Sequence, residues 1–238
     1  MSELQYDFND GYGSVPAHRH INSDGTKGGW VADSASVAST VYVEENALIF
    51  DNANILENVR ISGGAWISGN ASISGNARIS DKARVFGNAV VSDYAGVFDH
   101  VDIYGNARVS NCAKIFGYAR IYDCAEISGE VGISGGAYVF GEAKVFGNVN
   151  ISSEVFIFGK AEVSKTPIQI WGLAHSVTIF DNCIGIDCEQ RDGCKQYTFS
   201  EWRYFAREEI KRMDLSVLKV YSALEPLLDS LVGDSLRG

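Results

Sequence analysis

A six-residue repeat runs through more than half of the chain. Every sixth residue from Ala35 to Ala161 is Ala or Val, and every residue two positions later, from Val37 to Val163, is Val or Ile. No helix has a period of six, whereas residues i and i+2 of a strand point to the same side. Many hexads end in Gly-Asn, Asp-Asn or Gly-Gly, which accept positive φ at a corner. The pattern therefore predicts strands of about four residues and tight corners, coiled into a stacked polygon with Val and Ile inside.

This repeat resembles the hexapeptide-repeat family, whose chains form a left-handed parallel β-helix with three hexads in each triangular coil. The resemblance implies a mainly β fold in which residues 35–166 make about seven coils, about 34 Å long at about 4.8 Å per coil. Gly28-Gly29-Trp30-Val31, followed directly by the hexads, is similar to the start of YdcK-like hexapeptide-repeat proteins of bacterial and bacteriophage genomes.

Two segments flank the hexads. Residues 1–34 are expected to cap the coil, and residues 167–238 to form a small α+β tail. Short strands are expected over 168–172, 177–181 and 183–187. Thr198 and Glu201 have capping-box spacing, which predicts a helix to about Met213, and an amphipathic helix follows over 216–232. Ile170-Trp171-Gly172-Leu173 and Glu201-Trp202 resemble a C-terminal module of phage and prophage hexapeptide-repeat proteins.

Composition disfavours several classes of protein. The net charge of −10 disfavours non-specific binding to nucleic acid or to anionic membranes. No apolar run approaches the roughly 18 residues of a membrane span, and the first residues lack the pattern of a secretion signal. Five cysteines at irregular spacing do not suggest a disulfide framework. We therefore expect a soluble protein with reduced thiols in the cytoplasm, or in the host cytoplasm if a phage encodes it.

Three hexads per coil place residues 18 positions apart on the same face, and the three faces then differ. One face carries a ladder of serines, Ser74, Ser92, Ser110 and Ser128, and a second face is mixed. On the third face, one column holds Phe50, Ser68, Phe86, Tyr104, Tyr122, Phe140 and Phe158. The column beside it holds Leu48, Trp66, Arg84, Asp102, Arg120, Tyr138 and Phe156.

The aromatic face needs a cover, because soluble monomers avoid large exposed apolar patches. The same face of other subunits around a threefold axis is one cover, as in most relatives of this fold, and the C-terminal helices are another. The residues expected at such an interface are Phe50, Trp66, Phe86, Tyr138, Phe140, Phe156 and Phe158. The third cover is a ligand at a subunit boundary, where Arg84 and Arg120 would bind anionic groups and Tyr104 and Tyr122 would stack on a planar ring.

Histidines give little support to catalysis. Many hexapeptide-repeat proteins are acyltransferases with a histidine base, often on a loop that interrupts the coil, and no loop interrupts this repeat. His18 and His20 precede the coils and His175 lies in the tail, so His100, beside Asp99 at a corner, is the one candidate base. A solvated turn residue is the favoured interpretation of His100.

No metal or cofactor is expected. The zinc site of γ-type carbonic anhydrases needs three histidines, and the repeat contains one. His18 and His20 are therefore expected to be surface residues rather than ligands. Cys183, Cys188 and Cys194 lack paired C-x-x-C spacing and are expected to be buried thiols.

The sequence favours a non-catalytic, homotrimeric binding protein of phage type that holds a small anionic planar ligand. A nucleotide signal of host defence, sequestered as by a sponge, fits that description. Two alternatives stay open, namely an acyltransferase that uses coenzyme A and a purely structural trimer.

Overall fold

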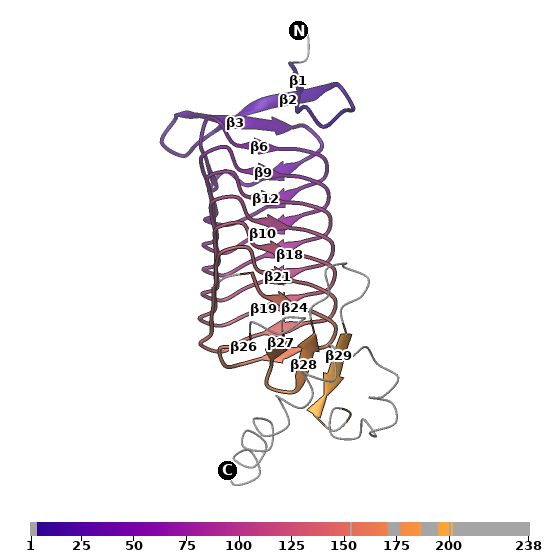
Figure 1. Ribbon diagram of the computed structural model, residues 1–238. Coiled ribbons are helices and arrows are strands. Elements are labelled where there is room, and N and C mark those ends of the chain that lie inside the picture. Colours follow the sequence, from indigo (N-terminus) through magenta and orange to yellow (C-terminus); the bar gives the residue numbers. More distant parts are fainter. Residues whose placement is uncertain (1–3, 153, 171–176, 187–194, 200, 202–238) are drawn as a thin grey trace. The chain divides into compact units, whose positions relative to one another are not determined.

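A computed structural model gives the fold of residues 4–152, 154–170, 177–186, 195–199 and 201 (Figure 1). The chain divides into two compact units, residues 1–160 and 161–238. In the first unit the chain coils as a parallel β-solenoid, which confirms the predicted mainly β, hexapeptide-repeat architecture. No helix of the described residues is long and apolar enough to cross a membrane.

Each coil adds one strand to each of three walls in the described part of the first unit. The wall that carries most of the rings, the aromatic wall, consists of β3 (Lys27–Ala32), β6 (Leu48–Ile49), β9 (Trp66–Ile67), β12 (Arg84–Val85), β15 (Asp102–Ile103), β18 (Arg120–Ile121), β21 (Tyr138–Val139) and β24 (Phe156–Ile157). The wall with the serine ladder contains β4 (Ser36–Val37), β7 (Asn54–Ile55), β10 (Ser72–Ile73), β13 (Val90–Val91), β16 (Arg108–Val109), β19 (Glu126–Ile127) and β22 (Lys144–Val145). The mixed wall contains β5 (Tyr42–Val43), β8 (Arg60–Ile61), β11 (Arg78–Ile79), β14 (Gly96–Val97), β17 (Lys114–Ile115), β20 (Gly132–Ile133) and β23 (Asn150–Ile151).

Neighbouring strands of a wall lie one coil apart in the sequence. Arg84 pairs with Asp102, and Asp102 pairs with Arg120. These registers confirm the predicted step of 18 residues. The strands are shorter than predicted, however: the turn takes Gly87 and Asn88 as expected, but the residues that flank it, Phe86 and Ala89, are not part of a strand.

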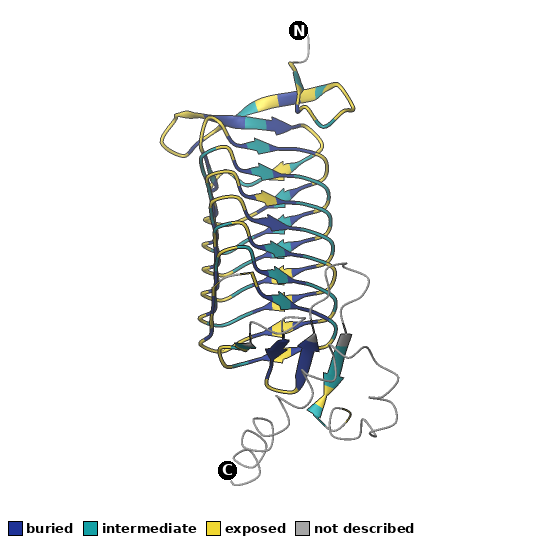
Figure 2. Cartoon of the chain, in the orientation of Figure 1, coloured by how far each residue is buried: buried dark blue, intermediate teal, exposed yellow. Residues whose placement is uncertain are grey.

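The inward residues of the hexads form a continuous core. From Val41 to Val163 all of these Ala, Val and Ile residues are buried, and the most exposed of them, Val155, is 3% exposed. Figure 2 shows them as dark blue segments in successive coils. Burying a side chain such as Ile103 stabilises the fold by about 1.5–3 kcal/mol, so the repeated pattern supplies much of the driving force for coiling.

Corner residues link each coil to the next. Asp99 has a φ of 57°, and its carboxylate accepts a hydrogen bond of 2.8 Å from the backbone N–H of Gly117, 18 residues later. Asp51 and Asp123 do the same for the N–H groups of Gly69 and Gly141. Asp and Asn therefore suit these corners because they tolerate positive φ and supply an acceptor for the next coil.

The N-terminal segment packs against the first coils. β1 (Gln5–Asp7) pairs with β2 (Ser14–Ile21), and β2 pairs with β3, both antiparallel. Gly28 and Gly29 lie on β3 where it passes the first coil, and a Cβ at either position would collide with the carbonyl oxygen of Val43 or Ala47. This close approach gives a physical reason for the Gly-Gly pair before Trp30.

The second unit contains a small antiparallel sheet. The sheet consists of β26 (Ile168–Ile170), β27 (Val177–Ile179), β28 (Cys183–Ile186) and β29 (Lys195–Thr198). β25 (Glu162–Val163) is also a described strand of this unit but lies outside this sheet. The sheet order β26-β27-β28-β29 confirms the three predicted strands and adds β29, which the sequence analysis did not foresee.

The predicted capping box is present at the end of β29. The N–H of Thr198 donates to Glu201 Oε2 at 2.8 Å, which lowers the pKa of Glu201, and the N–H of Glu201 donates to Thr198 Oγ1 at 3.1 Å. Phe199 and Glu201 are helical. The rest of the two predicted helices lies outside the described residues.

Substitutions at Asp99 test the corner mechanism. We expect Asp99→Ala to lower the free energy of unfolding by about 1–2 kcal/mol, because it removes the acceptor and leaves a side chain at positive φ. Asp99→Gly keeps the φ and is expected to cost less, and Asp99→Asn is expected to be nearly neutral. Urea denaturation measures all three, and an Ala variant as stable as the Asn variant would contradict the mechanism.

Candidate ligand-binding wall

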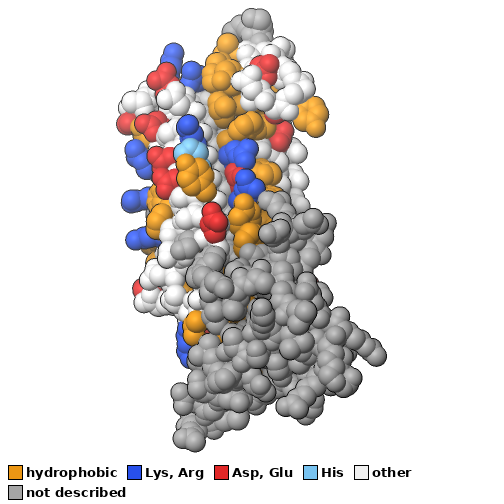
Figure 3. Space-filling model, in the orientation of Figure 1, with side chains coloured by type: hydrophobic (Ala, Val, Ile, Leu, Met, Phe, Trp, Pro, Cys, Tyr) orange, Lys and Arg blue, Asp and Glu red, His pale blue; other side chains and the backbone are white. Residues whose placement is uncertain are grey.

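The two outward columns of the aromatic wall lie where the 18-residue step predicts them. One column follows the strands, from Phe50 to Phe158, and the other is formed by the first residue of each strand, from Leu48 to Phe156. Figure 3 shows this face, on which hydrophobic side chains lie above and below a group of basic and acidic ones. The wall therefore combines ring surfaces with charge.

Five rings of the first column form a continuous stack. The ring centroids are 4.9 Å apart for Phe86 and Tyr104, 5.0 Å for Tyr104 and Tyr122, and 5.0 Å for Tyr122 and Phe140, with interplanar angles of 4°, 2° and 3°. Phe158 continues the stack at 5.7 Å and 19° from Phe140. The rings lie nearly parallel because each coil repeats the backbone of the previous one.

The stack changes what Tyr104 and Tyr122 can offer a ligand. Each of these rings has a neighbour on both faces, so a planar ligand cannot stack face to face on either one. Their edges remain on the outer surface, because both side chains are half-buried. A planar ligand that stacks on a ring must therefore bind at another position on the wall.

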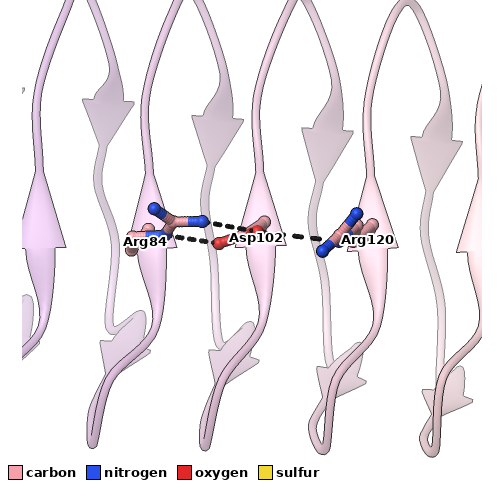
Figure 4. A network of polar contacts seen from close by, with 3 residues as sticks. All are labelled: Arg84, Asp102 and Arg120. Atoms are coloured by element: carbon pink, nitrogen blue, oxygen red, sulfur yellow. Dashed lines mark hydrogen bonds and ion pairs between the residues drawn. The ribbon is translucent and has the colours of Figure 1, made fainter.

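Arg84, Asp102 and Arg120 form a charged network in the second column (Figure 4). Arg84 donates from Nε to Oδ1 of Asp102 at 2.7 Å and from Nη2 to Oδ2 at 2.8 Å, which raises the pKa of the guanidinium group. Nε of Arg120 lies 3.8 Å from Oδ2 of Asp102, a looser ion pair. Asp102, 9% exposed, thus faces two guanidinium groups with one carboxylate, which leaves the network with a net positive charge.

Phe50, at the N-terminal end of the first column, is covered by the chain itself. Its ring stacks on Phe8 at 4.8 Å and contacts Trp66 at 5.4 Å, so that Phe50 is 3% exposed. The predicted interface residue Phe50 therefore has almost no surface left for another subunit. Sequence analysis missed this cover, because Phe8 precedes the repeat and its position cannot be counted from the hexads.

The other predicted interface residues differ in exposure. Phe158 is buried in the single chain. The half-buried ones are Trp66, Phe86, Tyr138, Phe140 and Phe156. Tyr138 and Phe156 stack at 4.8 Å and 3°, in parallel with the first column. The central and lower parts of the wall thus retain the apolar surface that the sequence predicted.

A hollow of about 150 Å³ interrupts the wall at Ser68. Its lining residues are Trp66, Ser68, Arg84 and Phe86. The indole Nε1 of Trp66 is buried and has no hydrogen-bond partner among the described residues, which is uncommon for a buried donor. The sequence analysis noted the serine as an interruption of the column but did not predict a hollow.

Histidine geometry adds little to catalysis. The exposed His100 stacks on Tyr118 at 4.9 Å and 19°, and its imidazole ring has no hydrogen-bond partner among the described residues. Nδ1 of His18 lies 2.7 Å from Oδ1 of Asp33, and Nε2 of His20 lies 3.0 Å from the carbonyl oxygen of Val41. The surface position expected for His20 is wrong, because the residue is buried between the N-terminal strands and the first coil. His175 lies outside the described residues.

The described cysteines are free thiols. Cys112 and Cys124 are exposed, and Cys183 is buried as predicted. Burial raises the pKa of Cys183 to about 11, so its thiol stays protonated near neutral pH. Cys188 and Cys194 lie outside the described residues. Among the described side chains, no group of three His, Cys, Asp or Glu residues is arranged to hold a metal ion.

Comparison with known proteins gives no family assignment. No protein-family model and no curated protein matches the chain.

Neutralising Asp102 tests the charged network. We expect Asp102→Asn to lower the free energy of unfolding by about 1 kcal/mol, because two guanidinium groups lose their shared partner, and the half-exposed positions of Arg84 and Arg120 limit the effect. The decrease in the free energy of unfolding should be smaller in 1 M salt, because salt screens the charges.

Glu142→Gln is the matched control for Asp102→Asn. Oε2 of Glu142 lies 3.8 Å from Nζ of Lys160, and both side chains are exposed. We expect almost no change in the urea midpoint for this variant. Equal effects of the two substitutions would contradict a special role for Asp102.

Proposed function

We propose that the chain is a non-catalytic binding protein that holds a small, planar, anionic ligand against its aromatic wall. The observation that carries this proposal is the network of Arg84, Asp102 and Arg120, in which one carboxylate faces two guanidinium groups beside stacked rings. A local positive charge on a chain with a net charge of −10 suits an anionic ligand of small size better than a nucleic acid.

Arginine and aromatic groups together select a ligand class. Guanidinium groups bind phosphates and carboxylates through paired N–H donors, and rings bind flat, weakly hydrated surfaces. Arg120 is the better placed of the two arginines, because its contact with Asp102 is longer and its guanidinium lies 5.6 Å from the Tyr138 ring centroid. Nucleotides combine both features.

Further subunits complete the proposal. The half-buried rings between Phe86 and Phe156 suit burial against other copies of the chain, and the resemblance to hexapeptide-repeat proteins favours a homotrimer. The ligand would then lie at a subunit boundary. The resemblance to phage proteins favours a nucleotide signal of host defence, held by sequestration rather than turned over.

The two alternative functions, an acyltransferase and a purely structural trimer, fit the wall less well. An acyltransferase needs a base with an orienting partner, and His100 stacks on Tyr118 with no such partner among the described residues. A purely structural trimer gives no reason for an arginine excess on an otherwise apolar wall. The wall therefore supports binding better than either alternative.

Calorimetry with the full chain and a panel of linear and cyclic nucleotides tests the proposal. We expect at least one nucleotide to bind, and Arg120→Ala to weaken its binding about tenfold or more, since a lost charged hydrogen bond is worth about 1.5–3 kcal/mol. Arg108→Ala is the matched control, because Arg108 is an exposed arginine on the serine wall, and it should bind as the wild type does.

Two outcomes would overturn parts of this proposal. Absence of binding by every nucleotide, or equal binding by Arg120→Ala and Arg108→Ala, removes the ligand site as proposed. Sedimentation equilibrium measures the subunit number against the chain mass of 25.8 kDa, and a monomer at working concentration removes the subunit boundary.

A further inference from the structure

We infer that the planar ring of the ligand binds in the hollow at Ser68, here termed the Ser68 gap, rather than on Tyr104 or Tyr122. This inference rests on the proposed function and names the subsite within it that accepts the ring. The starting observation is that the ring column is complete from Phe86 onward and lacks one ring at Ser68.

The Ser68 gap has the dimensions of one missing ring. Coils rise by about 4.8 Å, so the two coils between Phe50 and Phe86 leave about 9.6 Å, which is two stacking distances. The gap measures about 150 Å³. A protein cavity of about 150 Å³ accommodates benzene, so the gap can accept a single six-membered ring.

Two aromatic side chains bound the Ser68 gap. Among the described rings Phe86 stacks only on Tyr104, so no described ring covers its other face, and the Arg84 guanidinium lies 5.9 Å from its centroid. Trp66 also lines the gap, and its ring centroid lies 5.4 Å from that of Phe50 at an interplanar angle of 43°. A planar ligand in the gap would therefore stack on Phe86, with Trp66 forming an adjoining part of the lining.

Polar groups at the Ser68 gap favour a ligand with acceptor atoms. Ser68, whose hydroxyl can donate a hydrogen bond, and Arg84 both line the gap. Arg84 uses Nε and Nη2 for Asp102, and Figure 4 shows its third guanidinium nitrogen turned away from Asp102, toward the preceding coil. That preceding coil carries Trp66 and Ser68, so the third nitrogen is directed to the side of the gap.

These features define the chemistry of the ligand. It is a six-membered planar ring with acceptor atoms on its edge and an anionic group within reach of Arg84. The base and phosphate of a pyrimidine nucleotide meet this description, and so does an aromatic carboxylate. Arg84 also binds Asp102, so it links the Ser68 gap to the charged network.

Filling the gap with a ring from the protein is the direct test. Uridine 5′-monophosphate and benzoate are titrated separately into the full chain and into Ser68→Phe by calorimetry. We expect Ser68→Phe to bind the active probe at least tenfold more weakly, because its ring occupies the vacant step. Ser68→Ala is the matched control, since it leaves the gap open, and should bind within about threefold of the wild type.

A second variant keeps the test valid if Ser68→Phe is destabilised. Ser68→Phe should keep the wild-type thermal midpoint, because rings occupy the same column in the following coils. If the midpoint falls, Phe86→Leu replaces Ser68→Phe in the test, since it removes the open ring face and keeps an apolar side chain. We expect Phe86→Leu to weaken binding at least tenfold as well.

The outcomes separate this inference from the proposed function. Binding of uridine 5′-monophosphate alone identifies a nucleotide, and binding of benzoate alone identifies an aromatic carboxylate. Wild-type affinity in both Ser68→Phe and Phe86→Leu, or equal affinity for ribose 5-phosphate, which has no ring, overturns the gap as the ring subsite. The proposed function survives that result if Arg120→Ala still weakens nucleotide binding, and it fails together with the inference if neither probe nor any nucleotide binds the wild type.

Discussion

Backbone hydrogen bonds between successive coils are the constraint on which the rest of this molecule depends. The N–H of Arg84 donates to the carbonyl of Val101 at 2.8 Å, and the N–H of Phe86 donates to that of Ile103 at 2.9 Å. The same pattern recurs along all three described walls. Because these N–H groups bond to carbonyls 17 positions later, each strand residue lies beside the residue 18 positions on. Side-chain chemistry is therefore arranged in columns, and the properties of a wall follow from which residues share a column.

A few outward positions that break the repeat, rather than the repeat itself, distinguish the surface of this molecule. The inward Ala, Val and Ile residues are nearly interchangeable from coil to coil, and they hold the walls apart at a fixed width. On the aromatic wall, by contrast, Asp102 sits between two arginines, and Ser68 stands where neighbouring coils carry rings. A single different residue in a regular column thus creates either a charged group, as at Asp102, or a space that a ligand can fill, as at Ser68. A rigid scaffold with a few irregular positions is well suited to hold a small ligand without catalysing a reaction.

Sequence reasoning succeeded where the periodic pattern determines geometry. The 18-residue step, the buried hexad positions and the placement of Arg84, Asp102 and Arg120 in one column all follow from counting residues. Left-handedness came from the resemblance alone. Counting could not show that parallel ring planes cover both faces of Tyr104 and Tyr122, because that depends on side-chain rotation. Nor could it show that Phe8 covers Phe50 or that His20 is buried, since the N-terminal strands lie outside the repeat and share no period with it.

Excision of whole or partial coils tests most directly that the 18-residue column organises the molecule. Deleting residues 105–122 removes one coil and returns every later residue to its own wall, whereas deleting residues 105–116 keeps the hexads in phase but moves every later residue to a different wall. Thermal unfolding followed by circular dichroism compares the two. We predict that the larger deletion keeps a single cooperative transition with the higher midpoint, because the ring stack and the coil-to-coil contacts are restored. An equal or higher midpoint for the smaller deletion would contradict the account.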